Sequence, residues 1–181
     1  IDPVDVSLIT VSTSWSGVIT DRVIFVDPGV ADYQSLIAHA GTSATIVVLD
    51  AHTDGVGQIH DYLINSNGLI STVDIISHGE AGVLYLGSTT LSCHNIAQYE
   101  GLLSDIGHQL TQDANILLYG CYVAAGQAGQ RFIDRLAELT GTDVAASTNL
   151  TGAATLGGDW VLEAVSTDGE VRADALQIPA Y

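Results

Sequence analysis

The sequence predicts an α/β domain in which helices cover both faces of a mainly parallel sheet, giving a three-layer sandwich. The main observation is that short aliphatic runs, of the length and composition of buried strands, alternate with segments of helical periodicity. Strands and helices that alternate in this way form crossover units, and crossover units build parallel sheets. The second observation is the length, because 181 residues suit one domain with a substantial core.

The first half of the chain is expected to supply three strands and two helices. Residues 1–20 are rich in Ser, Thr and Val and are interpreted as an N-terminal extension or an edge strand, before a single domain over 21–181. The strands VIFVD and TIVVLD are expected at 23–27 and 45–50, and helices at 32–40 and 55–65. The third strand, STVDIISHG, ends at His78.

The second half is expected to begin with an interruption of this rhythm. Apolar alternation over 82–92, around Gly87-Ser88, predicts a small hairpin insertion. The later elements are a helix over 95–110, the strand NILLYG before Cys121, a helix over 127–139 that ends at Gly141, and a strand over 143–147. Strand-like segments on both sides of Thr167-Asp168-Gly169 predict a C-terminal hairpin.

Two strand ends carry the side chains of greatest chemical interest. His78 is followed by Gly79 at the end of one buried strand, and Cys121 ends another. In open α/β sheets, ligands bind beyond the carboxyl ends of the strands, so residues placed there are suited to chemistry. A thiol beside an imidazole is the composition of a cysteine nucleophile with its base. The alternative is packing, in which the cysteine fills the core and the histidine is a satisfied polar group.

Composition excludes several classes of partner. The chain has 21 acidic residues against four basic ones, all arginine, and a formal net charge of -17. This charge argues against binding to nucleic acid or to an anionic membrane and favours cations and basic peptides. No segment has the apolar length needed for membrane insertion. The two cysteines form neither a disulfide framework nor a zinc spacing, so no metal site is predicted from them. The chain starts without a methionine or a leader, as expected for part of a larger multidomain protein.

The order of elements, with one strand ending Ser-His-Gly and another ending Gly-Cys, resembles the caspase-hemoglobinase fold of caspases, legumain, gingipains and clostripain. The segments ISHGEAGVLYLGSTTLS, ILLYGCYVAAGQAGQRFIDRLAELTGTDVAAS and LGGDWVLE also resemble an uncharacterised bacterial domain of very large secreted, repeat-rich, adhesin-like proteins. The second resemblance covers nearly all of residues 21–165. Both imply a caspase-like domain, with a strand order of about 2-1-3-4-5, in a protein that is extracellular or at the bacterial cell surface.

The resemblance implies a cysteine endopeptidase with a His-Cys dyad. Cys121 would be the nucleophile and His78 the general acid and base, and the backbone amides of Gly79 and Cys121 would bind the oxyanion. The residue that closes the first strand, Asp27, would line the substrate pocket and favour arginine or lysine. The alternative for Asp27 is a local role, in which its carboxylate caps the turn before Pro28-Gly29.

Further implications concern the substrate and the cofactors. Ser147 and Thr148 correspond to the segment that holds the substrate backbone in relatives. The substrate would be a peptide or the protein's own polypeptide, and autoprocessing at a basic site would take place at Arg22 or Arg172. Calcium stays open as a cofactor because some relatives depend on it, although no EF-hand spacing is present. Asp50, His52 and Asp54 are interpreted as a polar turn rather than a metal site. The competing hypothesis is a non-catalytic binding or capping module of an adhesin.

Overall fold

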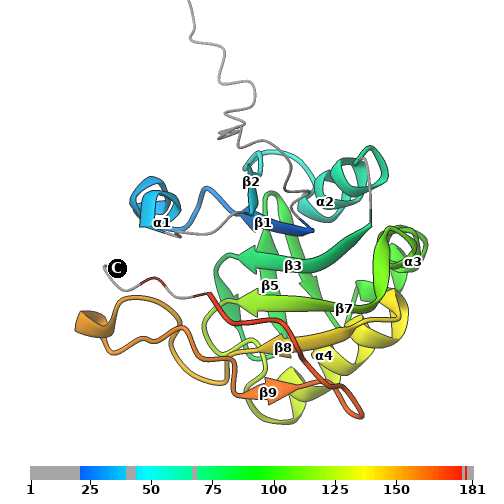
Figure 1. Ribbon diagram of the computed structural model, residues 1–181. Helices are drawn as coiled ribbons and strands as arrows, with labels where there is room; N and C mark the ends of the chain where they lie inside the picture. Colours follow the sequence, from blue (N-terminus) through cyan, green and yellow to red (C-terminus); the bar gives the residue numbers. More distant parts are fainter. Residues whose placement is uncertain (1–20, 40–43, 67–68, 177, 179–181) are drawn as a thin grey trace, which may run out of the picture.

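A six-stranded sheet organises the fold in the computed structural model, which describes residues 21–39, 44–66, 69–176 and 178 (Figure 1). The strands lie in the order β2-β1-β3-β7-β8-β9. Their bounds are β1 Arg22–Val26, β2 Thr45–Val48, β3 Ile70–Ile76, β7 Leu110–Tyr119, β8 Asp143–Ala146 and β9 Ala164–Val165. The first five strands in this order are parallel and β9 is antiparallel to β8. The α/β class and the predicted order of the five parallel strands are therefore confirmed.

Helices cover both faces of the sheet, as predicted for a three-layer sandwich. On one face lie α2 (Gly55–Ile64), α3 (Glu100–His108) and α4 (Gly126–Thr140), whose apolar sides share one core cluster with the strands. The other face is covered by α1 (Tyr33–His39) and by the C-terminal segment, which contribute Leu36 and Leu176 to a second cluster. Adjacent residues of a strand point to opposite faces, so each central strand supplies both clusters and is buried on both sides.

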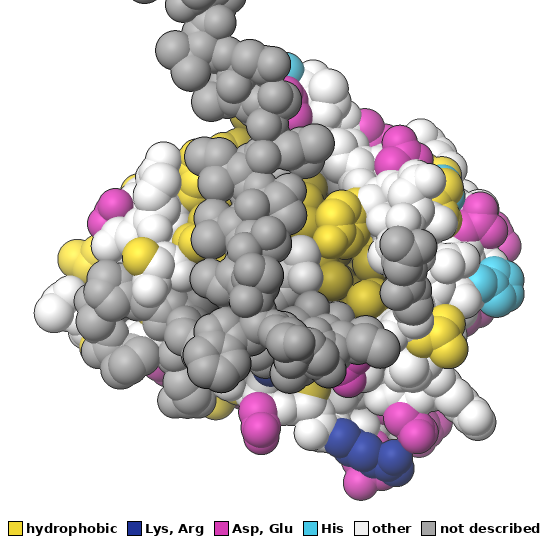
Figure 2. All heavy atoms as spheres, turned by 45° about the horizontal axis from the view of Figure 1, so that its top comes forward, with side chains coloured by type: hydrophobic (Ala, Val, Ile, Leu, Met, Phe, Trp, Pro, Cys, Tyr) yellow, Lys and Arg dark blue, Asp and Glu magenta, His cyan; other side chains and the backbone are white. Residues whose placement is uncertain are grey.

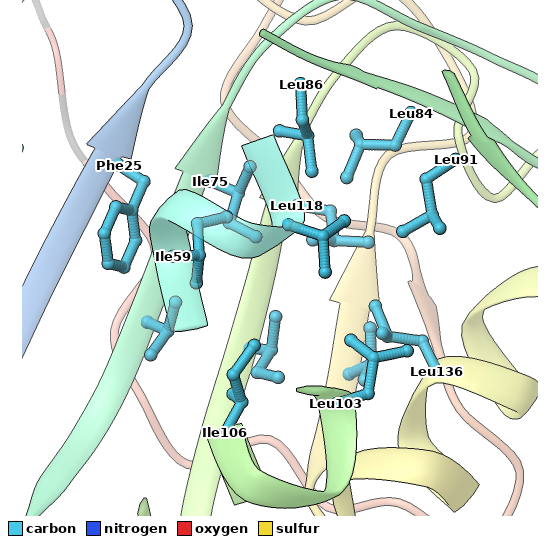
Figure 3. Packing of buried hydrophobic residues seen from close by; sticks show 14 of the residues in the cluster. Phe25, Ile59, Ile75, Leu84, Leu86, Leu91, Leu103, Ile106, Leu118 and Leu136 are labelled. Carbon is cyan, nitrogen blue, oxygen red and sulfur yellow. The ribbon is translucent and has the colours of Figure 1, made fainter. Parts of the chain in front are cut away.

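The predicted hairpin insertion is present and extends to three short strands. These are β4 (Gly79–Glu80), β5 (Val83–Leu86) and β6 (Thr89–Ser92), which form a separate antiparallel sheet. Leu84, Leu86 and Leu91 are buried in the larger core cluster, where they pack above Leu118 and Ile75 (Figure 3). The insertion is thus anchored by its own apolar side chains, and a 3-10 helix, η1 (Ile96–Tyr99), leads from it into α3.

Two glycines and one aspartate explain where helices start, stop and meet. Asp54 accepts a hydrogen bond from the Val56 amide and caps the N-terminus of α2. Gly141 ends α4 in the left-handed conformation, with a φ of 67°, as its place after the helical pattern predicts. A Cβ at Gly107 would lie 1.8 Å from the Thr140 carbonyl oxygen, so glycine allows α3 and α4 to pack closely.

The predicted C-terminal hairpin is only half present. The chain turns at Ser166–Gly169, where the Gly169 amide donates to the Ser166 carbonyl oxygen, but no strand follows among the described residues. Backbone amides of the following segment instead bond to side chains of β7. The amides of Arg172 and Ala173 donate to Asn115 Oδ1, and the Leu176 amide donates to the Tyr119 hydroxyl. These side-chain acceptors draw the segment across the sheet face and away from β9.

A buried ion pair joins the first residue of β1 to a residue in the middle of the neighbouring strand β3. Asp74 of β3 has a fully buried side chain, and Arg22 of β1 donates to both of its oxygens, at 2.7 and 2.8 Å. Burial raises the pKa of Asp74, an effect that the Arg22 guanidinium opposes. The interpretation of residues 1–20 lies outside the described residues. None of the described helices is both long and apolar enough to cross a membrane.

Candidate active site

His78 and Cys121 lie at the same edge of the sheet, each two residues beyond its strand. The parallel ladder between β3 and β7 pairs Ile76 with Tyr119, and the Ser77 amide extends it by donating to the Tyr119 carbonyl oxygen at 3.1 Å. His78 therefore lies two residues after Ile76, and Cys121 lies two residues after its partner Tyr119. The fold thus places the backbones of both residues at neighbouring strand ends, on the same edge of the sheet.

The His78 ring is exposed, but both its ring and its backbone are held. Nε2 lies 3.0 Å from the carbonyl oxygen of Gly29, in the loop that follows β1. A carbonyl can only accept, so the neutral ring carries its proton on Nε2 and leaves Nδ1 as an acceptor. The His78 carbonyl oxygen accepts from the Tyr85 amide of β5 at 3.1 Å. The ring is thus oriented by a third group, as a catalytic base requires.

Cys121 is partly buried and sits in a strained turn. Its thiol donates to the Thr151 carbonyl oxygen, with Sγ 3.7 Å from that oxygen. The next residue, Tyr122, has a φ of 61°, a left-handed conformation that costs a non-glycine residue about 1–2 kcal/mol. Its amide donates to the Asn149 carbonyl oxygen at 2.7 Å, which holds the turn in place. Strain of this kind recurs at functional sites.

The two side chains contact different loops. The ring of His78 bonds to the loop after β1, and the Cys121 thiol bonds to the loop after β8. Among the described residues no hydrogen bond joins the ring to the thiol. Catalytic hydrogen bonds are often loose before substrate binds, so this geometry is that of a resting site or of an unused one.

The predicted oxyanion donors also lie at this edge. The Tyr85 amide donates to the His78 carbonyl oxygen, and the next pair of the antiparallel β4–β5 ladder is Gly79 with Leu84. Hydrogen-bonded and non-hydrogen-bonded pairs alternate along such a ladder, so the amides of Gly79 and Leu84 point away from each other. A Cβ at Gly79 would lie 2.4 Å from Val123 Cγ2, which requires glycine there. The Cys121 amide donates no hydrogen bond to the backbone of the described residues.

Asp27 adopts the local role that the sequence left open as its alternative. Its side chain is buried, with 8% of the residue exposed. Oδ1 accepts from the Gly29 amide at 2.7 Å, and Oδ2 accepts from the Gly87 amide of the β5–β6 turn at 2.6 Å. Both oxygens are therefore engaged by backbone amides of the protein itself.

Ser147 and Thr148 follow β8 and border the turn that carries Cys121. Ser147 is fully buried, and its carbonyl oxygen accepts from the Ala124 amide at 2.9 Å. The amide of Thr148 donates to Glu163 Oε2 at 2.7 Å, and the Thr148 hydroxyl donates to the same oxygen. Ser147 thus bonds to the turn that follows Cys121, and the Thr148 amide is capped by a carboxylate.

The loop after β8, which accepts the Cys121 thiol hydrogen bond, is also bonded to two carboxylates. The Asn149 side-chain amide bridges Asp159 and Glu163, at 3.3 and 2.6 Å, and no arginine or histidine of the described residues pairs with either carboxylate. Figure 2 shows acidic side chains spread around the visible face, where basic side chains are sparse. A peptide with positive charge would be attracted to such a surface.

Other residues considered in the sequence lie in turns and strands away from His78 and Cys121. Asp50 accepts from the His52 amide, and Asp54 caps α2, which confirms the polar turn. In the described part of the chain, no three His, Cys, Asp or Glu side chains gather to hold a metal ion. Arg22 is held within β1 by its pair with Asp74, whereas the Arg172 side chain is 60% exposed, beside Asp113 and Glu170.

No pattern in the sequence singles out the Gly29 carbonyl or the Glu163 carboxylate. A backbone acceptor has no side chain to reveal it, and its only signal was the Pro28-Gly29 turn after a strand. Glu163 lies in a segment that was interpreted as one half of a hairpin, in which its contact with Thr148 could not be foreseen.

Comparison with known proteins adds the family. No curated protein matches the chain. Among solved structures it is similar to the crystal structure of caspase-1 from Spodoptera frugiperda, with 11% sequence identity and a TM-score of 0.35. The match covers 75% of this chain and 64% of that one, so the chain spans less than two thirds of the caspase. A family model described as "Domain of unknown function (DUF4347)" matches residues 23–179. The protein belongs to this DUF4347 family.

Proposed function

We propose that this domain is a cysteine endopeptidase that acts through His78 and Cys121. The observation that carries the proposal is the hydrogen bond from His78 Nε2 to the Gly29 carbonyl oxygen, next to a thiol at the neighbouring strand end. An exposed histidine without a functional role does not require a backbone acceptor that fixes its tautomer. A positioned imidazole, a thiol and free backbone amides are the groups that acyl transfer needs.

The first half of the proposed reaction forms an acyl-enzyme. Nδ1 of His78 takes the thiol proton, and the Cys121 thiolate attacks the carbonyl carbon of the scissile peptide bond. The negative charge that develops on the carbonyl oxygen is stabilised by the backbone amides of Gly79 and Cys121. The C–N bond then breaks, and the His78 imidazolium returns its proton to the leaving amine.

The second half releases the product. A water molecule gives a proton to the His78 imidazole and attacks the thioester carbon, and the C–S bond breaks to free the carboxylic acid. The thiol recovers its proton from the imidazolium, so the enzyme is regenerated without a cofactor. Throughout, the Gly29 carbonyl stabilises the imidazolium and holds the ring in one orientation.

The proposed substrate is a peptide, including the protein's own polypeptide, near basic residues. The net charge of -17 and the carboxylates of Asp159 and Glu163 near Cys121 favour a cationic segment. Arg172 is the exposed basic residue outside the helices, whereas cleavage at Arg22 would require the loss of strand β1. In this proposal the domain trims itself or a neighbouring part of a larger secreted surface protein.

The test is alkylation by iodoacetamide as a function of pH, quantified separately at Cys121 and Cys93 by mass spectrometry. Cys93 is an exposed thiol that follows β6 and is not part of the dyad, which makes it an internal control. In the wild type, Cys121 should react faster than Cys93 at neutral pH. In His78→Ala that advantage should disappear, while the rate at Cys93 stays the same. Arginine-containing peptides would then serve as trial substrates.

A second candidate function is a non-catalytic binding or capping module. It is favoured by the divergence of the two side chains, since the thiol bonds to Thr151 and the ring to Gly29. Slow labelling of Cys121 that is indifferent to His78 would reject the peptidase and leave this module as the better reading of the site.

A further inference from the structure

Asp27 carries a buried carboxylate whose charge is stabilised by hydrogen bonds from backbone amides alone. Only 8% of the residue is exposed, and in the described chain it forms no salt bridge. Its two oxygens accept from the Gly29 amide, at 2.7 Å, and the Gly87 amide, at 2.6 Å. Hydrogen bonds from neutral donors to a charged acceptor are strong, and they offset the cost of burying the charge. An ordinary turn aspartate at the surface would need only the first of these bonds.

The first bond acts on the residue that orients His78. Gly29 receives the His78 Nε2 hydrogen bond on its carbonyl oxygen and donates its amide to Asp27. The peptide that carries this carbonyl is held by the Val30 amide, which donates to the Asp27 backbone carbonyl oxygen at 3.1 Å, and the Asp27 side chain holds the preceding peptide through the Gly29 amide. Because glycine has more backbone freedom than any other residue, both peptides must be held for the carbonyl to keep one direction. A Cβ at Gly29 would lie 2.8 Å from Asp27 Oδ1, so the close contact with the carboxylate itself requires glycine.

The second bond joins the same carboxylate to the hairpin that holds the His78 backbone. Gly87 turns the chain between β5 and β6 with a φ of 56°. Two residues earlier, the Tyr85 amide donates to the His78 carbonyl oxygen. The loop that holds the ring and the hairpin that holds the backbone of His78 therefore converge on one buried group.

We infer that Asp27 is a positioning residue for His78, acting through the Gly29 peptide and the β5–β6 turn, and not a residue that contacts substrate. It holds the Gly29 carbonyl where Nε2–H can donate to it, and so keeps Nδ1 unprotonated. The consequence for thiol reactivity rests on the proposed function, but the orientation of the ring does not.

The experiment compares Asp27→Asn with a matched control, Asp54→Ala. An asparagine keeps one acceptor oxygen and puts an amide group against the other backbone amide, so one of the two bonds is lost. Asp54 anchors the same hairpin, through the Thr89 hydroxyl, and caps α2, but it does not contact Gly29. The tautomer of His78 is read by ¹H–¹⁵N correlation NMR, with the signals assigned from His78→Ala, and Cys121 alkylation is measured in parallel.

The wild type should show the Nε2–H tautomer. In Asp27→Asn a mixture of the two tautomers should appear. At equal populations Cys121 should react about twofold more slowly, because only the Nε2–H tautomer leaves Nδ1 free to accept the thiol proton. Asp54→Ala should lower the melting temperature and leave the tautomer unchanged. A folded Asp27→Asn with the wild-type tautomer would overturn the inference.

A second pair of variants covers the case in which Asp27→Asn does not fold. Gly29→Ala pushes a methyl group against the same carboxylate and should also produce the tautomer mixture. In Asp27→Ala the carboxylate is absent, so a methyl group at position 29 meets no clash. Adding Gly29→Ala to this variant should therefore change the tautomer populations much less than adding it to the wild type. Equal changes in the two proteins would reject the inference. If wild-type alkylation is indifferent to His78, the peptidase fails while the tautomer still decides the role of Asp27.

Discussion

The carboxylate of Asp74 depends on a single side chain for its charge partner. Its side chain is 0% exposed, and Arg22 donates to both oxygens. Removing one member of a buried pair leaves an uncompensated charge, which costs about 3–5 kcal/mol. Arg22→Ala should therefore lower the free energy of unfolding by about that amount, measured by urea denaturation at neutral pH.

The same variant should have a distinctive pH dependence. Burial raises the pKa of Asp74 above its ordinary value of 3.8, and the loss of Arg22 raises it further. Between the unfolded and folded pKa values the native state binds more protons, so its stability falls as pH rises through that window. The deficit of Arg22→Ala should be small near pH 4 and grow toward neutrality. As a control, Arg22→Met with Asp74→Leu removes both charges and should recover most of the loss; no recovery would contradict the assignment.

At this scale the sequence predicts which side chains lie at the strand ends, but not the contacts that support them. His78, Cys121 and Gly79 were recognisable because their types are unusual at strand ends. The role of Asp27 depends on the amide of Gly87, which lies 60 residues away and was predicted only as part of a hairpin turn. A contact between two loops is fixed by the packing of both, and no local pattern reports it.

At the scale of elements, two glycines isolate the energetic role of a helix cap. Gly141 ends α4 with a φ of 67°, and Gly101 is the second residue of α3, with ordinary helical backbone. A Cβ at either position would meet nothing within 4 Å, so packing does not distinguish them. Gly141→Ala should lower the free energy of unfolding by about 1 kcal/mol, because alanine is strained in the left-handed backbone conformation. Gly101→Ala should raise the free energy of unfolding by about 0.5–1 kcal/mol, because alanine is the better helix former.

Chemical denaturation of the two single variants measures this difference, and wild-type protein is the common reference. Equal effects in the same direction would show that the two termini respond to something other than backbone conformation.

The elements themselves were the most predictable part of the molecule. Aliphatic runs such as NILLY and the periodicity of the helix before Gly141 depend on local sequence, and both match the structure. The segment after Gly169 was predicted wrongly as the second strand of a hairpin. Its amides are taken by Asn115 and Tyr119 of a distant strand, and that competition cannot be seen in the alternation of Val171 and Ala173.

For the whole molecule, the dominant electrostatic fact is an excess of negative charge. With 21 acidic residues and four basic ones, self-repulsion opposes the compact state. Salt shortens the screening length from about 30 Å at 0.01 M to about 8 Å at 0.15 M, so repulsion across the molecule is strong only in dilute buffer. The same field attracts cationic peptides, so their association with the edge of the sheet should weaken over the same range of salt.

Raising sodium chloride from 0.01 to 0.15 M at neutral pH should therefore stabilise the domain. We expect about 1 kcal/mol, which is roughly 2–4 °C in melting temperature for a domain of this size. The control is the same salt step near the isoelectric point of about 4.1, where the net charge is close to zero and the effect should nearly vanish. A loss of stability on adding salt at neutral pH would mean that favourable pairs such as Arg135–Glu138 outweigh the net repulsion, contrary to the small contribution expected of exposed pairs.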